Sequence, residues 1–311
     1  IMNPIKIIGI DLGKSSFHVI GRDKHDVPIF RKKFSRVQLI EYLSNLPVCI
    51  VAFEACGGAH WLGRKCQALG HQVKLIPPQY VKPFVKSNKN DFIDAEAISE
   101  AATRPNMRFV SVKSEDAQVI SAIHRIRQGY IKERTVCMNR IGSLLLEFGI
   151  SLPKGHCKMR GLFSWLAMQK CSFPPKLMQE IVGQHEYYLH LNIQIKEQDK
   201  KLIQLVEQHP LGTLLKPIPG VGDMTASLCI ANISSAADFK SGRNMAAWLG
   251  LVPRQHSTGG KPTLLGISKR GNKALRTLFI HGARAVMSKP ETVGKVYGDW
   301  LVRLRQTNSP V

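Results

Sequence analysis

The sequence of 311 residues is poor in acidic side chains, with 22 Asp and Glu residues against 44 Lys and Arg and a formal net charge of +22. The basic residues are spread along the chain, which argues against a neutral globular domain with a basic tail. Such an excess favours a polyanionic partner, most simply nucleic acid, although it is also compatible with a protein that charge only keeps in solution. We therefore predict an extended phosphate-binding surface whose affinity falls steeply with salt.

Paired cysteines, aromatics and long apolar runs are also scarce. The seven cysteines are odd in number and none is spaced Cys-x-x-Cys, which argues against a disulfide framework or a zinc ribbon. No apolar run reaches the roughly 18 residues of a transmembrane helix, and Asp11 interrupts the first residues too early for a signal peptide. We therefore expect a cytoplasmic protein. Aromatics make up 7% of the chain, which disfavours reading single-stranded bases by stacking.

The first hundred residues alternate between β-branched runs and helical patterns. Residues 5–11, 16–22 and 27–34 predict an antiparallel meander of three strands. Helical and extended patterns then alternate over 37–46, 49–55, 61–69, 72–76, 81–86 and 92–102. The order β-β-β-α-β-α-β-α predicts a mixed sheet with helices on its faces, which is the element order of the ribonuclease H-like fold.

The rest of the chain predicts mainly helices. Apolar residues recur at helical spacing over 115–148 and 177–208, separated by an irregular stretch, 153–175. The two long helices pair either as an antiparallel coiled coil or within an ordinary bundle. A further unit begins near residue 211. We therefore expect three regions, namely 1–112, 113–210 and 211–311.

A short Pro/Gly segment in the third region precedes an Ala-rich helix. The segment reads Ile-Pro-Gly-Val-Gly-Asp and contains Gly220 and Gly222. It resembles the hairpin of a helix-hairpin-helix motif, in which backbone N–H groups at a helix N-terminus meet a phosphate. The alternative is a plain turn followed by a helix cap.

Four acidic residues stand where the element order brings carboxylates together. Asp11 ends the first predicted strand and Glu54 ends the fourth, and these two strands are neighbours in a ribonuclease H-like sheet. Asp91 and Asp94 open a helix at positions i and i+3, so they share a face. We therefore predict that the four carboxylates bind Mg²⁺, two ions per site, for phosphodiester cleavage.

Each of these acids also has a simpler interpretation. Asp11 fits a strand-end turn, Asp91 a helix N-cap, and Asp94 a first-turn partner of the helix dipole. Glu54 is harder to explain this way because it lies inside an apolar run. Residues 9–16 also look like the first phosphate loop of actin-like ATPases and sugar kinases, but the chain is short for the two domains that such enzymes usually need.

A second polar group gathers near residue 257, in what we expect to be a flexible loop. Ser257 is a candidate nucleophile, and His256 beside it is a candidate proton carrier. Four nearby cations would stabilise an anionic transition state: Arg254, Lys261, Lys269 and Arg270. The alternative is a loop that only grips phosphates.

Taken together, the motifs resemble a known family. GIDLGKSSF with Asp11, FEACGG with Glu54, and NDFIDAEA with Asp91 and Asp94 resemble the DEDD transposases of insertion-sequence family one-hundred-and-ten, whose relatives include the Piv-type DNA invertases. PIPGVGDMTA, AAWLGLVPRQHSTGGK and GISKRGNKALR are similar to the second conserved domain of that family. The resemblance covers almost the whole chain, and the HSTGG form is similar to the Coxiella-type subgroup.

The resemblance implies an RNA-guided DNA transposase or recombinase. It implies a RuvC-like domain, a coiled-coil middle and a mainly helical C-terminal transposase domain, with a structured guide RNA that pairs with donor and target double-stranded DNA. The four acids would bind Mg²⁺, and Ser257 would form a covalent phosphoserine link to DNA. In the family the two sites meet between protomers of a dimer within a tetramer, so a homo-oligomer is expected, with no membrane partner.

Two rival functions remain open. A RuvC-like, metal-dependent junction nuclease without a covalent intermediate would need the four acids but not Ser257. A non-catalytic protein that binds RNA or DNA would need neither the acids nor the serine.

Overall fold

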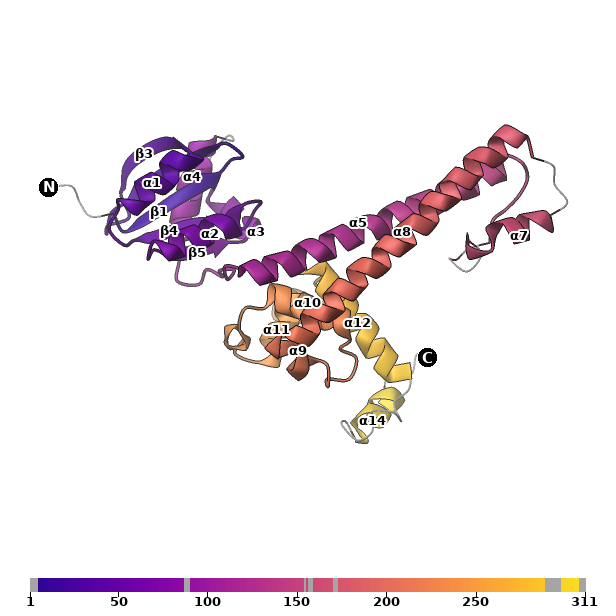
Figure 1. The fold of residues 1–311 in the computed structure, drawn as a ribbon. Coiled ribbons are helices and arrows are strands. Elements are labelled where there is room, and N and C mark those ends of the chain that lie inside the picture. Colours follow the sequence, from indigo (N-terminus) through magenta and orange to yellow (C-terminus); the bar gives the residue numbers. More distant parts are fainter. Residues whose placement is uncertain are drawn as a thin grey trace. The chain divides into compact units, whose positions relative to one another are not determined.

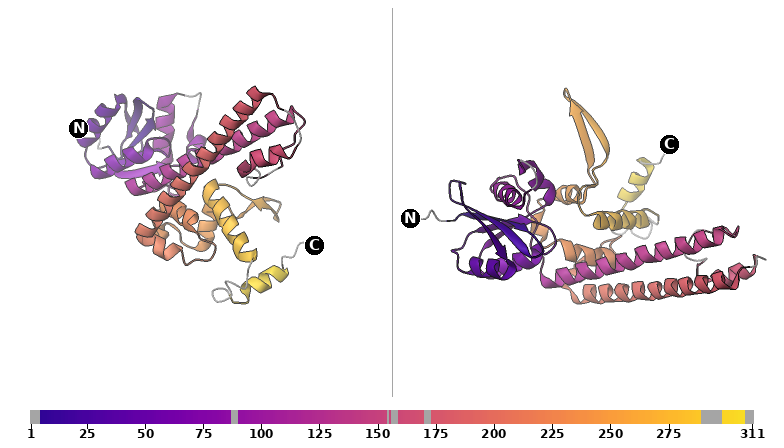
Figure 2. Two further views of the ribbon diagram at one scale, coloured as in Figure 1. Left: turned by 45° about the vertical axis from the view of Figure 1, so that its right-hand side comes forward. Right: turned by 90° about the horizontal axis from the view of Figure 1, so that it is seen from above.

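A computed structural model describes residues 5–86, 90–153, 155, 159–169, 173–288 and 298–307. The chain divides into two compact units, Ile1–Glu115 and Asp116–Val311. Their elements are labelled in Figure 1 and seen from two further sides in Figure 2. Among the described residues, no helix combines the length and the apolar character that crossing a membrane requires.

The first unit is built on a five-stranded mixed sheet with the strand order β3-β2-β1-β4-β5 (Figure 1). The strands are β1 (Ile7–Leu12), β2 (Ser16–Arg22), β3 (Pro28–Ser35), β4 (Ile50–Glu54) and β5 (Gln72–Ile76). The first three strands pair antiparallel, whereas β4 runs parallel to both β1 and β5. The predicted mixed sheet is therefore confirmed, and β1 and β4 are neighbours.

Helices cover both faces of this sheet. They are α1 (Arg36–Ser44), α2 (Ala59–Ala68), α3 (Pro78–Val81), the 3₁₀ turn η1 (Lys82–Phe84) and α4 (Asp91–Ala101). Alternate residues of a strand point to opposite faces, so one face buries Ile8 and Ile10 under α1 and α2. The other face buries Ile7 and Ala52 against α3 and α4. The face that carries α4 is the one on which the candidate site is built.

Two long helices dominate the second unit, α5 (Glu115–Leu146) and α8 (Pro175–Gln208), as predicted. Arg134 donates a hydrogen bond to Asn192 at 2.9 Å, and Arg140 donates one to Gln184 at 2.6 Å. As the residue number rises on α5 it falls on α8, so the helices form an antiparallel pair, visible in both views of Figure 2. The predicted irregular stretch between them contains a short helix, α7 (Leu162–Ala167).

This short helix was missed because its apolar residues are too few to show a period. Leu162 and Leu166 are buried in a cluster with Ile141 and Tyr188 of the long helices. Tertiary burial therefore outweighs the weak local signal that Gly161 and the nearby prolines give. Two cysteines of the stretch, Cys157 and Cys171, lie outside the described residues.

The remaining elements are mainly helical, as predicted for the C-terminal region. They are α9 (Pro210–Leu215), α10 (Asp223–Asn232), the 3₁₀ turn η2 (Ala236–Asp238), α11 (Gly242–Leu249), β6 (Pro253–Thr258), β7 (Lys261–Ile267), α12 (Lys273–Ser288) and α14 (Trp300–Thr307). Leu228, Leu249 and Leu275 bring α10, α11 and α12 together in one buried cluster. Strands β6 and β7 form a separate antiparallel hairpin.

Candidate active site

The sheet places two of the predicted acids at the carboxyl ends of two neighbouring inner strands. Strands β1 and β4 are parallel and pair Ile10 with Phe53, so Asp11 and Glu54 come next on the two strands. Ile7 and Ala52 point toward α4, and the alternation of strand side chains puts Asp11 and Glu54 on that same face. The predicted proximity of Asp11 and Glu54 is thus a property of the sheet.

Helix α4 reaches these acids because β1 carries a glycine beneath it. A Cβ atom added to Gly9 would lie 2.4 Å from the backbone oxygen of Ala95 and 2.8 Å from the backbone nitrogen of Ser99. The helix backbone therefore rests directly on the strand, and its first turn carries Asp91 and Asp94. Gly9 is accordingly a packing residue in this fold, which accounts for it without a phosphate loop.

Ion pairs and hydrogen bonds to β2 and β3 hold α4 against the sheet. The buried Arg22 of β2 donates from Nε to Ser99 Oγ at 2.7 Å and lies 3.7 Å from Glu96. Arg31 of β3 donates to the other Glu96 oxygen at 2.7 Å. The helix cap is Asn90, whose side chain accepts from the Phe92 backbone, so the N-cap interpretation of the following aspartate is wrong.

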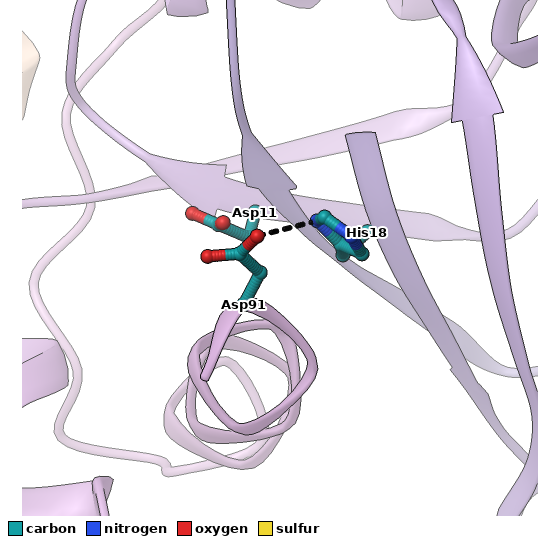
Figure 3. Close-up of side chains that lie close together, drawn as sticks. All are labelled: Asp11, His18 and Asp91. Carbon is teal, nitrogen blue, oxygen red and sulfur yellow. Dashed lines mark ion pairs between the residues drawn. The ribbon is translucent and has the colours of Figure 1, made fainter. Parts of the chain in front are cut away.

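The ligand atoms of Asp11, His18 and Asp91 all lie within 4.8 Å of one another (Figure 3). Asp91 Oδ2 is 3.3 Å from His18 Nδ1. Sequence reasoning missed His18, although a signal existed: in the tight β1–β2 hairpin, Asp11 and His18 are directly opposed. Opposed residues of an antiparallel pair share a face.

Glu54 carries the electrostatic signature of the cluster. Burial raises the pKa of its carboxyl above the ordinary value, and the negative charges of Asp11 and Asp94 raise this pKa further, against a smaller lowering effect of Lys82. Asp11 thus lies near Glu54 on the sheet, and the charges of Asp11 and Asp94 both act on Glu54, but the group of ligand atoms within 4.8 Å contains Asp11 and Asp91 and not Glu54 or Asp94. Converging carboxylates repel one another, and a divalent cation would relieve that repulsion.

The donor set fits a hard divalent cation. Carboxylate oxygens are the protein ligands that Mg²⁺ prefers, and an imidazole nitrogen beside them also suits Mn²⁺ and other transition metals. Asp91 is exposed and the other three acids are partly exposed, so the cluster is accessible from solvent. A phosphodiester could therefore approach it.

Ser257 lies on a strand, so the expected flexible loop is wrong. Strands β6 and β7 are joined by the two residues Gly259 and Gly260, with φ of 57° and 76°. A type I′ hairpin turn requires positive φ at both central positions, which glycine supplies without strain. The Gly-Gly pair between two extended runs was the available signal for a hairpin.

The side chains of the hairpin are exposed, and strand alternation sorts them by face. Gln255 Nε2 donates a hydrogen bond to Ser257 Oγ at 2.8 Å, so these two residues share a face. His256 lies between them in sequence and belongs to the opposite face. The Ser257 hydroxyl is thus contacted by Gln255 and not by the predicted His256, and the sequence analysis did not identify Gln255 as its partner.

Backbone contacts fix the base of the hairpin. A Cβ atom added to Gly250 would lie 1.9 Å from the Arg270 oxygen, and one added to Gly271 would lie 1.9 Å from the Trp248 oxygen. The four predicted cations lie along this structure, with Arg254 on β6, Lys261 at the start of β7, and Lys269 and Arg270 at the base.

The predicted phosphate-binding turn joins α9 to α10. Gly220 has a φ of 84°, and a Cβ atom there would lie 2.8 Å from the oxygen of Gly282 on α12. Gly222 is the N-cap residue of α10, where Asp223 pairs with Lys216 at 3.0 Å. Gly220 therefore has a packing role in addition to any contact with phosphate.

Comparisons with known proteins now decide the family. Residues 212–298 match the family model described as Transposase IS116/IS110/IS902 family, and residues 8–150 match the DEDD transposase model of IS110. A transposase for insertion sequence element IS1328 from Yersinia enterocolitica is 46% identical, over 96% of this chain and 89% of the relative. The chain belongs to the IS110/IS116/IS902 transposase family.

Two further relatives agree with the sequence analysis. The transposase for insertion sequence element IS1111A from Coxiella burnetii is 40% identical to this transposase, over 92% of its chain and 79% of the relative. The pilin gene-inverting protein of Moraxella lacunata is 24% identical, over 71% and 62% of the two chains. The predicted family and the Coxiella-type resemblance are confirmed, and the protein is a DNA transposase of an insertion sequence.

Proposed function

We propose that this transposase is an RNA-guided recombinase in which an acidic metal site and a serine nucleophile cleave and rejoin DNA strands. The metal ligands in this proposal are Asp11, Glu54, Asp91 and Asp94, and the nucleophile is Ser257. The convergence of carboxylates beside β1 carries the proposal, because acids brought together in a protein of net charge +22 favour a divalent cation. The residues fit Mg²⁺, which when bound supplies stabilisation of charge on the reacting phosphate and leaving oxygen.

The strand-cleavage step is a phosphoryl transfer. Ser257 Oγ gives up its proton to a base and forms a bond to phosphorus, while the bond from phosphorus to one deoxyribose oxygen breaks. That oxygen takes up a proton and becomes a free hydroxyl, and the strand stays attached as a phosphoserine ester. Rejoining is the reverse reaction with the hydroxyl of another strand, so no external energy source is needed.

The basic residues would hold the nucleic acids. Arg254, Lys261, Lys269 and Arg270 would contact phosphates around the serine, and the backbone near the N-terminus of α10 would contact one more through Gly220 and Gly222. Sequence would be read by base pairing of a guide RNA with donor and target duplexes. The low aromatic content agrees with this division of roles.

The three regions have separate roles in the proposal. Residues 1–112 would be a RuvC-like domain of the ribonuclease H-like fold, 113–210 a coiled coil, and 211–311 the C-terminal transposase domain. The protein would act in the bacterial cytoplasm as a dimer that becomes a tetramer when two DNAs are held together. The alternative is a RuvC-like junction nuclease, favoured by the fact that the acids converge within the first unit alone.

Trapping of a covalent complex tests the proposal. Protein, Mg²⁺, the RNA encoded beside the gene and labelled DNA with the element ends would be combined and separated on denaturing gels. We expect a protein–DNA adduct that Ser257→Ala and Asp11→Asn both abolish. Thr263→Ala is the matched control, because it removes a hydroxyl from the same hairpin at the position paired with His256. Cleavage without an adduct, unchanged in Ser257→Ala, would establish the metal-only nuclease instead.

A further inference from the structure

One side chain of the carboxylate cluster is neither acidic nor predicted from the sequence. His18 lies on β2, directly opposite Asp11 in the antiparallel pair with β1. Its side chain is only 9% exposed, whereas that of Asp91, which it contacts, is 57% exposed. A buried imidazole therefore contacts a mostly solvated carboxylate, and Figure 3 marks this contact with a dashed line.

We propose that His18 is the positioning residue for Asp91. With its proton on Nδ1, the imidazole holds Asp91 Oδ2 at 3.3 Å and keeps the carboxylate turned toward Asp11. The inference rests on the proposed metal site, to which it adds the group that orients one ligand. Carboxylates that bind metals are commonly oriented by such outer contacts.

The position of Asp91 explains why orientation is needed. Asp91 is the first residue of α4, so only one side of its backbone is held by the helix. An exposed aspartate at such a place loses side-chain entropy when a metal fixes its rotamer. Contact with a residue of the sheet removes part of that cost before the metal arrives.

The imidazole itself is fixed by packing. Its ring meets the ring of Phe92 edge to face, with centroids 4.7 Å apart and planes at 76°. Phe92 follows Asp91 on α4, so the helix that carries the ligand also clamps the ring that orients it. Gly9 and the Arg22 contacts hold this helix on the sheet, which makes the spacing from β2 to Asp91 a fixed distance.

Two substitutions separate positioning from simple packing. His18→Leu keeps an apolar side chain against Phe92 and removes the nitrogen, whereas His18→Asn supplies an amide N–H close to the position of Nδ1. The matched control is His71→Leu, because His71 is also buried in the first unit and its ring contacts the backbone of Leu43 and Cys49. His71→Leu tests what loss of a structural histidine does.

The readout is Mn²⁺ affinity of the intact protein, measured by calorimetry and by the electron paramagnetic resonance of the bound ion. We expect His18→Leu to weaken binding by about 10–100-fold, as removal of outer contacts does. His18→Asn should restore most of the affinity, and His71→Leu should lower the unfolding temperature with the affinity unchanged. Circular dichroism of each variant checks that the fold is kept.

The outcomes separate the inference from the metal site. If Asp11→Asn abolishes binding while His18→Leu leaves it unchanged, the role of His18 is overturned and the metal site stands. Nitrogen hyperfine coupling to Mn²⁺ that disappears in His18→Leu would make His18 a direct ligand, which also overturns positioning. If the wild-type protein binds no Mn²⁺, or binds it equally well after Asp11→Asn, the metal site is disproved and the role of His18 with it.

Discussion

The carboxylate cluster and the serine hairpin differ in what holds them. The carboxylates rest on a five-stranded sheet, under a helix that contacts β1 through Gly9 and β2 through Arg22. The hairpin of β6 and β7 has an exposed side chain at nearly every position, and close backbone contacts at Gly250 and Gly271 hold its base. The carboxylate cluster is held by the core of its own sheet, whereas strands β6 and β7 of the hairpin have little packing to fix them.

This difference indicates what must hold the side chains of each site in position. A cluster of like charges needs a rigid scaffold, because its members repel one another until a cation binds. A hairpin whose proposed nucleophile is exposed needs an external surface to orient it, and in the proposed function nucleic acid or another protomer would provide that surface. Substitution of Ser257 in the hairpin should therefore remove function without loss of stability, whereas disruption of the packing beneath the carboxylates should lower stability and function together.

The largest effect is expected in the hairpin. Because Ser257 is the nucleophile in the proposed function, Ser257→Ala should lower transposition in cells by more than about 1,000-fold, the scale on which removal of a catalytic nucleophile acts. The unfolding temperature should stay the same because Ser257 is exposed. Transposition assays and thermal unfolding of the same variant measure the two quantities, and a large loss of stability would contradict the comparison.

The next effect is expected under the carboxylates. Gly9→Val should destabilise the first unit by about 1–3 kcal/mol or more, because its side chain would collide with the backbone of α4. Transposition should fall with stability, unlike in Ser257→Ala. Gly57→Ala is the control, since a Cβ atom there meets no other atom within 4 Å. Denaturant unfolding of both variants is the measurement, and equal stabilities would refute tight packing at β1.

A loss of stability of comparable size is expected at the base of the hairpin. Gly271→Ala should cost roughly 1–3 kcal/mol, because its φ of 103° is strained for alanine and the new Cβ would meet the Trp248 oxygen. Gly266→Ala, in β7, should cost less than about 1 kcal/mol because the space around it is open. Unfolding curves that rank these two variants the other way would show that the arms, not the base, anchor the hairpin.

The smallest effect is expected for Glu54→Gln. The folded state raises the pKa of Glu54, so it binds more protons than the unfolded state and its stability falls as pH rises between the two pKa values. Glu54→Gln should therefore raise the unfolding temperature of the chelator-treated protein at about pH 8, by roughly a few degrees at most, and leave it unchanged near pH 4. Thermal scans at both values test this, and a loss of stability near pH 8 would contradict the repulsion.

Local patterns predicted the scaffold of the site better than its details. The nearness of Asp11 on β1 and Glu54 on β4 followed from the element order and from the neighbouring positions of strands one and four in a ribonuclease H-like sheet, because the carboxyl ends of parallel neighbours lie together. His18 needed the register of a hairpin, which depends on the turn at Gly13 rather than on hydrophobic pattern. The hairpin around Ser257 was missed because its exposed strands bury too little to show alternation.

The role of Gly9 was also beyond local prediction. A glycine in a β-branched run is compatible with a bulge, a phosphate loop or a close approach. Only the placement of α4 across β1 selects the last of these. The role of Gly9 was therefore determined by packing between elements far apart in sequence, and not by the local motif.

The antiparallel pair of α5 and α8 has a mechanical consequence. At about 1.5 Å per residue, a helix of 34 residues such as α8 is about 50 Å long, close to fifteen base-pair steps of B-form DNA. A rod of this length acts as a lever, since a tilt of a few degrees at one end moves the other end by several ångströms. The length of the helix pair therefore sets the distance between a partner bound at one end and whatever is bound at the other.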